Sequence, residues 1–375
     1  MNDLNMQLFG QDLFGNPIEQ QHKSVLYKQF IHPPFTVLDA RQGYWQERKR
    51  AWLSLGIKSE LGREEGITWG ESDAMTSPSL NPDSDLEKAR QSKVKSNLAN
   101  PRDDRSVDWP KAGEVKDTTS EHRTVKRHSY DITGRPDYFQ QSAQTGTSIF
   151  DPVLCELMYT WFCPEGGLIL DPFAGGSVRG IVATSLNRYY MGIELRPEQI
   201  VANQEQANQI CKEHKPEWIE GDAANLDVLV DEAKFDFVFS CPPYGNLEIY
   251  SDDTRDISNM SHEDFLSVYQ TIIHKSLDAL KPDRFACFVV GDFRGPDGNY
   301  RQFVADTIKT FAEWGGQLYN EAILITQVGS APIRARNAYK ASRKLCKTHQ
   351  NVLIFVKGDA KRATKFIESA NQLSE

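Results

Sequence analysis

The sequence predicts an α/β fold in which a mostly parallel sheet is covered by helices and ends in an antiparallel hairpin. From residue 146 onward, short apolar runs alternate with amphipathic stretches of helical period. Such alternation requires parallel strands with helices on both faces of the sheet. The last two apolar runs, 318–328 and 349–357, have no room for a helical crossover unless the basic segment between them supplies one. They therefore predict an antiparallel pair at the edge of the sheet, with a long insertion.

The predicted elements follow one another in regular order. A helix over 151–162 opens the series, because its apolar residues form one stripe. The predicted strands cover residues 167–171, 189–195, 218–222, 235–242 and 285–291. The helices between them cover residues 177–186, 197–211, 262–280 and 302–314.

Composition divides the chain into four parts. Residues 1–70 form an N-terminal accessory region, which contains a predicted helix over about 41–55. Residues 71–145 are rich in Ser, Asp, Asn, Lys and Thr and carry few apolar side chains. Because little in this stretch can offset the entropy of ordering, we predict a mobile linker. Residues 146–360 form the α/β domain, and 361–375 form a C-terminal tail.

Overall composition excludes several classes of protein. The chain has 375 residues and a net charge of −9, and no apolar run approaches the ~20 residues that span a bilayer. Its polar start is unlike a signal peptide, so we predict a cytoplasmic protein without a membrane partner. The six cysteines include no Cys-x-x-Cys pair, which argues against both a zinc site and a disulfide framework. No metal is predicted.

One segment is locally basic although the chain is acidic. Between 334 and 347 there are six cations and no acidic residue, namely Arg334, Arg336, Lys340, Arg343, Lys344 and Lys347. The segment is either a solvated face or a surface for nucleic acid phosphates. The order of the motifs along the chain places this segment beside the Phe-Ser-Cys-Pro-Pro-Tyr turn at 239–244. This favours nucleic acid as the partner of the segment. The basic helix around Trp45 and Trp52 is the second candidate.

A glycine turn follows the first predicted strand of the α/β domain. Leu168–Ser177 reads as a strand, then Gly175 and Gly176, then a helix. Paired glycines let a ligand approach the backbone, and such a turn lies where open parallel sheets bind ligands. A tight turn without a ligand is the alternative.

Two acids end the next two strands. Glu194 lies about 20 residues past the glycine turn, which suits a ribose diol, and Asp222 could accept a hydrogen bond from an adenine amino group. No phosphate-binding lysine accompanies them. This pattern favours an adenosyl group over a nucleotide.

The turn at 239–244, Phe-Ser-Cys-Pro-Pro-Tyr, is the most informative motif. Prolines fix φ and leave a rigid lip with free carbonyls after a buried strand. An amino-bearing ring could stack on Tyr244 while its NH2 hydrogens are accepted by Ser240 or Cys241 and by the Pro242 carbonyl. A plain proline turn is the alternative.

Four turns together carry a family resemblance. They read Asp-Pro-Phe-Ala-Gly-Gly, Gly-Ile-Glu, Gly-Asp-Ala and Ser-Cys-Pro-Pro-Tyr. Over about 147–357 the chain resembles the S-adenosylmethionine-dependent amino-methyltransferases that modify adenine N6 or cytosine N4 in DNA. The resemblance implies a Rossmann-like methyltransferase fold for the α/β domain and S-adenosyl-L-methionine as the cofactor. It also implies double-stranded DNA as the partner, base flipping, and a bacterial or phage restriction-modification setting.

The resemblance also assigns residues. Those for the cofactor are Ser148, Phe150, Asp171, Phe173, Ala174, Gly175, Gly176, Glu194, Leu195, Asp222 and Ala223. Those for catalysis are Ser240, Cys241, Pro242, Pro243 and Tyr244. The family usually has Asp, Asn or Ser directly before Pro-Pro. Sulfur accepts hydrogen bonds poorly, so Cys241 leaves two options: Ser240 and the Pro242 carbonyl hold the amine, or the substrate differs. The choice between adenine and cytosine stays open.

Two other functions fit the same motifs. An enzyme that methylates RNA guanine N2 or a protein glutamine is the first alternative, because such enzymes resemble the same lip. A DNA-binding protein that has lost catalysis is the second, with Cys241 as its mark. A homodimer is kept as an option among the partners.

Overall fold

The computed structural model of this protein describes residues 25–58, 68–69, 114–115, 125–126, 150–230, 235–245, 247–326 and 331–373. The chain separates into two compact units, one made of 1–77 with 149–375 and the other of 78–148. Most of the predicted linker, 71–145, lies outside the described residues. Within it the structure describes one antiparallel pair, β3 (Glu114–Val115) and β4 (Val125–Lys126).

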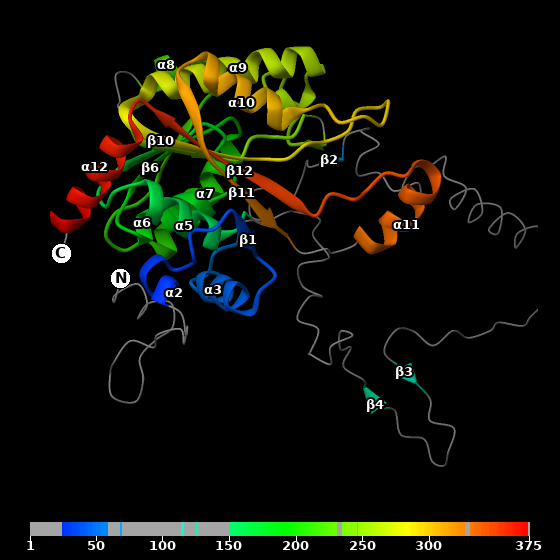
Figure 1. Ribbon diagram of the computed structural model, residues 1–375, viewed down its shortest axis with the longest axis horizontal. Coiled ribbons are helices and arrows are strands. Elements are labelled where there is room, and N and C mark those ends of the chain that lie inside the picture. Colours follow the sequence, from blue (N-terminus) through cyan, green and yellow to red (C-terminus); the bar gives the residue numbers. More distant parts are fainter. Residues whose placement is uncertain are drawn as a thin grey trace, which may run out of the picture. The chain divides into compact units, whose positions relative to one another are not determined.

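An eight-stranded mixed sheet forms the centre of the larger unit (Figure 1). In spatial order its strands are β7 (Glu217–Glu220), β6 (Tyr189–Glu194), β5 (Leu168–Asp171), β8 (Phe235–Ser240), β10 (Leu280–Val290), β12 (His349–Lys357), β11 (Gly316–Ile325) and β1 (Val37–Asp39). All neighbours are parallel except β12, which runs antiparallel to both β10 and β11. The predicted α/β fold class is therefore confirmed.

The strand order reverses between β5 and β8. The chain moves from β5 to β6 and β7 on one side, and then returns to β8 and β10 on the other. Ligands of open α/β sheets bind at the carboxyl ends of the strands beside such a reversal. This topology places the glycine turn after β5 and the lip after β8 next to each other.

Helices cover both faces of the sheet (Figure 1). One apolar core contains residues of α5 (Pro152–Phe162), α6 (Val178–Ser185), α7 (Pro197–Ile210) and α12 (Ala360–Leu373). The other contains residues of α9 (His262–Ala279) and α10 (Phe303–Glu313). Short helical turns at η2 (Ala223–Asn225), α8 (Leu226–Leu229) and η3 (Ile257–Asn259) complete the connections. Each predicted helix and strand of this domain is present, with ends shifted by a few residues.

The antiparallel pair at the end of the chain is present, but its expected place at the edge of the sheet is wrong. β11 pairs antiparallel with β12, and β1 then pairs parallel with the outer side of β11. The three residues of β1 are too few to show a hydrophobic period. Only the partner strand reveals them as part of the sheet.

The predicted basic helix near the N-terminus is α3 (Gly43–Ser54), which follows α2 (Val25–Phe30). Its two tryptophans are fully buried, and Trp52 Nε1 donates to Glu156 Oε2 of α5 at 2.8 Å. Arg48 forms a buried two-pronged ion pair with the same carboxylate. Because these side chains bind the α/β domain, they are not available to nucleic acid phosphates.

Two further helices occupy segments without an apolar signature. The insertion between β11 and β12 contains α11 (Ala331–Ser342), which carries much of the basic segment (Figure 1). Most of the expected C-terminal tail belongs to α12, whose Ala363 is fully buried and whose Arg362 pairs with Asp283 at 2.6 Å. Across the part of the chain that the structure describes, no helix is long and apolar enough to cross a membrane.

Candidate active site

The glycine turn and the lip are joined directly. Ser240, the last residue of β8, donates its hydroxyl hydrogen to Asp171 Oδ1 at 2.5 Å, and Asp171 is the last residue of β5. The adjacent strand ends are also tied, because the amide of Gly221 donates to the Glu194 carbonyl at 3.0 Å. The four signature turns of the sequence thus meet at one edge of the sheet.

Asp171 lies at the centre of a buried polar cluster. Its carboxylate also accepts from Arg179 Nε and from the Tyr190 hydroxyl, the latter at 2.8 Å, and its side chain is fully buried. Burial alone would lower the pKa of Arg179, but the charge and hydrogen bond of Asp171, together with the nearby Tyr190 and Cys241, outweigh burial and the pKa is raised. Burial and the same charge raise the pKa of Tyr190. The carboxylate is thus enclosed by protein donors.

Arg179 holds the glycine turn in shape. Its Nη2 donates to the carbonyls of Phe173 and Ala174, at 2.5 and 2.8 Å. The ring of Phe150 covers the guanidinium, with 4.6 Å between its Cζ and the ring centroid. Asp171 therefore holds the turn in two ways, directly by accepting from the Phe173 amide at 3.2 Å and indirectly through Arg179.

Glycine is required at two points of this turn. Gly175 has a φ of +52°, which L side chains rarely adopt. Gly192 on β6 lies so close to the turn that an added Cβ would stand 2.7 Å from the Cβ of Ala174. The Gly-Ile-Glu motif thus contributes close packing as well as a carboxylate.

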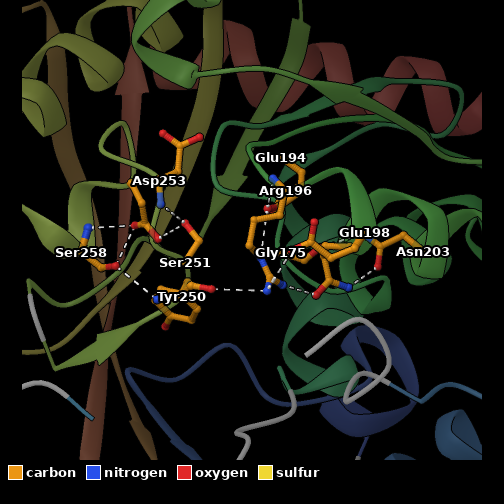
Figure 2. A network of polar contacts seen from close by, with 12 residues as sticks. Gly175, Glu194, Arg196, Glu198, Asn203, Tyr250, Ser251, Asp253 and Ser258 are labelled. Atoms are coloured by element: carbon orange, nitrogen blue, oxygen red, sulfur yellow. Dashed lines mark hydrogen bonds and ion pairs between the residues drawn. The ribbon is translucent and has the colours of Figure 1, made fainter. Parts of the chain in front are cut away.

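A chain of polar contacts runs from the glycine turn to the loop behind the lip (Figure 2). Asn203 Nδ2 donates to the Gly175 carbonyl at 2.7 Å, and Gln199 Nε2 donates to Asn203 Oδ1 at 3.0 Å. Arg196 Nη2 donates to Gln199 Oε1 at 2.8 Å, while its Nη1 reaches the Tyr250 carbonyl at 3.4 Å.

Arg196 also organises the first predicted acid. Its amide donates to Glu194 Oε1 at 3.0 Å, and its guanidinium lies 3.8 Å from the same oxygen. The Glu194 side chain remains partly accessible, whereas Arg196 is buried. One arginine therefore contacts both the proposed ribose carboxylate and the loop that follows the lip.

The second predicted acid caps a short helix. Asp222 Oδ1 accepts from the Ala224 amide at 2.9 Å, at the N-terminus of η2. Asp222 and Leu195 are half-buried, and Ala223 is buried. Asp222 and Glu194 follow adjacent strands, so their carboxylates flank one side of the site.

The lip holds its tyrosine in a defined place. Gln350 Nε2 of β12 donates to the Tyr244 hydroxyl oxygen at 2.7 Å, and the ring packs against Phe303 with centroids 6.2 Å apart. Burial, followed by the nearby Cys241, raises the pKa of Tyr244. The Cys241 sulfur lies 3.7 Å from the same hydroxyl. Tyr244 is therefore a neutral, oriented ring that is half-buried at the end of β8.

The Ser240 hydroxyl is directed inward. It is fully buried and donates to Asp171, so it does not reach the surface of the lip. Pro242 is buried, whereas Cys241 and Pro243 are half-buried. The Ser240 hydroxyl is therefore not available to a ligand at the surface of the lip.

The basic segment reaches the lip at its C-terminal end. An added Cβ on Gly291 would lie 3.6 Å from Tyr244 Cε2 and 3.8 Å from Lys347 Cε, which puts both side chains at one point. Burial lowers the pKa of Lys347, although Asp292 and Glu321 oppose the shift. Arg336, Lys340 and Arg343 are exposed on or just after α11, and Lys344 is half-buried. Arg334 lies on the same helix, and Ser148 lies outside the described residues.

The loop behind the lip pairs its acids internally. Asp253 forms an ion pair with Arg255 at 2.6 Å, and Asp256 accepts from the hydroxyls of Ser251 and Ser258. Within this loop β9 (Glu248–Ile249) pairs antiparallel with β2 (Thr68–Trp69) of the N-terminal region. Among the described residues, no group of three or more His, Cys, Asp or Glu side chains could hold a metal ion.

Sequence reasoning missed four residues that shape the site, namely Arg179, Tyr190, Arg196 and Gln350. Arg179 and Arg196 each start a helix directly after a signature turn, and that position was the available signal. Tyr190 and Gln350 lie in strands, where they fit the ordinary alternation of side chains between the two faces and gave no separate signal.

One family model matches part of this chain. The family model for DNA methylases of the N6/N4 type matches residues 62–205, which include the glycine turn and Glu194 but not the lip. The match supports the amino-methyltransferase family predicted from the four turns. Together with the fold, it supports S-adenosyl-L-methionine as the cofactor. No curated protein matches.

Solved methyltransferase structures are similar to this chain at low identity. TrmN from Thermus thermophilus is 16% identical with a TM-score of 0.38, and the match covers 60% of this chain and 55% of that one. A TehB-like methyltransferase from Corynebacterium glutamicum is 17% identical with a TM-score of 0.35, covering 58% and 93%. Magnesium protoporphyrin IX methyltransferase from Synechocystis is 12% identical with a TM-score of 0.35, covering 55% and 79%.

Proposed function

We propose that this chain, as an amino-methyltransferase, transfers a methyl group from S-adenosyl-L-methionine to the exocyclic amino group of a base flipped out of double-stranded DNA. The target is adenine N6 or cytosine N4. One observation carries the proposal: the Pro-Pro-Tyr lip follows β8 at the strand reversal, and Ser240 ties it to the glycine turn at 2.5 Å.

The residues at the strand ends fit an adenosyl cofactor. Gly175 and Gly176 are half-buried, and because they lack side chains a ligand could approach their backbone. Glu194 would accept from the ribose hydroxyls and Asp222 from the adenine amino group. The remaining residues that the family resemblance assigns to the cofactor would contact or cover it, namely Ser148, Phe150, Phe173, Ala174, Leu195 and Ala223.

Asp171 receives a different proposed role. Its carboxylate is enclosed by Arg179, Tyr190 and Ser240, so it positions the turn and does not itself contact the methionine part. The cluster would also fix the distance between the turn and the lip, since both are tied to the same carboxylate. Alignment of donor carbon and acceptor nitrogen is what this reaction needs most.

The lip residues would supply orientation and polarisation. The bound cofactor provides an electrophilic methyl carbon on a sulfonium. The Pro242 carbonyl and the Cys241 sulfur would accept the amine hydrogens, which draws the ring-delocalised lone pair toward a tetrahedral nitrogen. As the nitrogen–carbon bond forms, the carbon–sulfur bond breaks, and the amine then loses one proton to solvent.

Tyr244 would hold the flipped base by stacking. Gln350 orients the phenol from β12, and Phe303 supports the ring from α10. Stacking on an aromatic ring contributes ~1–3 kcal/mol per base, which offsets part of the few kcal/mol that unstacking costs.

The basic segment is the proposed contact for DNA phosphates. Its exposed Arg336, Lys340 and Arg343 lie on the connection that ends with Lys347 at Tyr244. Replacing Arg334, Arg336, Arg343 and Lys344 together by alanine should weaken DNA binding and flatten its dependence on salt. Unchanged affinity at every salt concentration would refute this part of the proposal.

A labelling experiment tests the proposed function. The protein is incubated with tritiated S-adenosyl-L-methionine and, separately, duplex DNA, RNA or a protein mixture, and the digested products are separated by chromatography. We expect label in N6-methyladenine or N4-methylcytosine from DNA. Label in RNA guanine or protein glutamine alone would overturn the proposal in favour of the first alternative. Cofactor binding without label in any substrate would favour a protein that has lost catalysis. Cytoplasmic location, a homodimer and a phage or restriction-modification setting stay predictions.

A further inference from the structure

The segment after β10 folds into a tight hairpin beside the lip. An isolated bridge joins Arg294 to Tyr300, the Gly295 amide donates to the Asn299 carbonyl at 2.9 Å, and the Arg301 amide donates to the Phe293 carbonyl at 2.9 Å. We propose that this hairpin, residues 293–301, is a binding site for a backbone phosphate of the DNA strand that carries the target base. The proposal rests on the proposed function and adds a contact outside the predicted basic segment.

A cavity opens between the hairpin, the lip and the start of α9. Its volume is about 140 Å³, many times the ~10–15 Å³ that one water molecule needs. Met260, Phe265 and Phe293 provide an apolar floor. Arg294, Arg301 and His262 also line it, and no carboxylate is among its ten lining residues. A cavity with this lining suits an anion and excludes a cation.

The hairpin is shaped to present Arg301. An added Cβ on Gly295 would stand 2.5 Å from Arg301 Nε and 2.7 Å from its Cζ, so the guanidinium lies directly on the glycine backbone. Any larger residue at 295 would displace it. The arginine is half-buried and lines the cavity.

Arg294 is held by uncharged partners. Its Nη1 donates to the Gly298 carbonyl at 2.9 Å, and its guanidinium lies 3.9 Å from the centre of the Tyr300 ring. Within the described part of the chain, neither Arg294 nor Arg301 forms an ion pair within 4.0 Å. Two guanidinium groups beside one cavity, neither in an ion pair with the described residues, form a site for a phosphate, which arginine binds through several donors.

The nearby carboxylates hydrogen-bond to other groups, although the charge of Arg301 adds to the hydrogen bonds of Asn299 in lowering the pKa of Asp297. Asp292 accepts from the Val304 amide at 3.0 Å, and Asp297 binds the backbone and side chain of Asn299. Asp306 lies near His262, and burial raises the pKa of Asp306. The Lys344 ammonium adds a further positive charge at the hairpin tip, 2.8 Å from where a Cβ on Gly298 would lie.

The position of the cavity selects which phosphate is bound. Gly245 follows Tyr244 directly and lines the cavity, and a Cβ added to Gly245 would stand 2.6 Å from Phe293. An anion in the cavity is therefore adjacent to a base stacked on Tyr244. When a nucleotide flips onto the lip, the phosphates on either side of it come close to the cavity. The phosphate that the site binds therefore belongs to the DNA backbone.

The test compares wild type with three variants, Arg294→Gln combined with Arg301→Gln, Gly295→Ala, and Arg362→Gln as a control. Arg362 is exposed on α12, and its substitution removes one positive charge where the double variant removes two. DNA affinity is measured by fluorescence anisotropy over a range of salt, and cofactor affinity by calorimetry. For the double variant we expect about a tenfold loss of DNA affinity and a salt slope lower by about 1, with cofactor affinity unchanged.

Gly295→Ala separates charge from geometry. It moves the Arg301 guanidinium without altering net charge, so it should weaken DNA binding while the control variant binds as wild type does. If the double variant and Gly295→Ala both retain wild-type affinity and salt slope, there is no phosphate site at the hairpin. Thermal unfolding of each variant guards against misfolding.

A charge-neutral methylphosphonate, placed at one position at a time around the methylated base, locates the phosphate. Wild type should lose affinity at one position that makes no difference to the double variant. Equal losses for both proteins at every position would overturn the inference. If wild type methylates no DNA, the proposed function fails, whereas methylation with unaltered variants contradicts the hairpin site alone.

Discussion

Arg179 and Arg301 both lie beside the central site, yet their surroundings are opposite. Arg179 is buried against the Asp171 carboxylate and two backbone carbonyls. Arg301 lies half-buried on a glycine backbone, next to a cavity lined by no carboxylate. The first region has its charges paired within the protein, and the second leaves positive charge for a partner.

This difference separates charges that build the site from charges that bind. Removing one partner of a buried pair leaves an uncompensated charge and costs stability. Removing a half-exposed cation that forms no ion pair costs little stability but removes a contact with the bound partner. Variants that disrupt paired charges and variants that remove a binding contact should therefore be detected by different assays. Four predictions test this comparison.

The largest effect is expected for Arg179→Met. The Asp171 carboxylate would stay buried without its cation, so the free energy of unfolding should fall by ~3–5 kcal/mol. Urea denaturation measures this, with Arg362→Met on the surface as a matched control that should leave stability unchanged. A variant as stable as that control would mean that the cluster around Asp171 is not the framework of the turn.

Tyr244→Ala should lose turnover while cofactor affinity is retained. The lost stacking amounts to ~1–3 kcal/mol, or about 5- to 150-fold in kcat/KM for DNA. Tyr244→Phe keeps the ring and loses the hydroxyl contacts with Gln350, Cys241 and the Val289 carbonyl, so it should retain most activity. The measurements are methyl transfer and calorimetry; weaker cofactor binding with normal turnover would show that the two pockets are misassigned.

Arg196→Gln should abolish the coupling between cofactor binding and DNA binding. Because Arg196 contacts both Glu194 and the Tyr250 carbonyl, we expect DNA to raise cofactor affinity about tenfold in wild type and to have little effect in the variant. Cofactor dissociation constants with and without duplex measure this. Asn203→Ala, which removes the contacts with Gly175 and Gln199 but leaves those of Arg196 with Glu194 and Tyr250, should weaken cofactor binding and keep the coupling. Equal coupling in all three proteins would contradict the proposed role.

The smallest effect is expected for Asp222→Ala. One hydrogen bond to the cofactor adenine contributes ~0.5–1.5 kcal/mol, so the cofactor dissociation constant should rise about two- to tenfold. The value of kcat at saturating cofactor should be preserved. Asp227→Ala on the following turn provides the control, since Asp227 pairs with Lys275 on the surface. An unchanged dissociation constant would remove Asp222 from the cofactor site.

Local patterns were enough to predict the strands, the helices and the four signature turns. Each of these is encoded over a few neighbouring residues: a run of apolar side chains, the glycines after β5, or the prolines after β8. Because parallel strands place their carboxyl ends together, the meeting of Asp171, Glu194, Asp222 and Tyr244 at one edge could also be predicted.

The roles of the charged residues depended on partners far away in the chain. Arg48 looked like a candidate for phosphate until Glu156, 108 residues later, was seen to pair with it, and Ser240 looked like a lip residue until its bond to Asp171 turned it inward. Likewise β1 became a strand only through β11, and Arg301 became a binding candidate through Gly295 and the cavity. Composition and periodicity report local preference, whereas the environment of a charge is set by which groups the fold brings within hydrogen-bond distance.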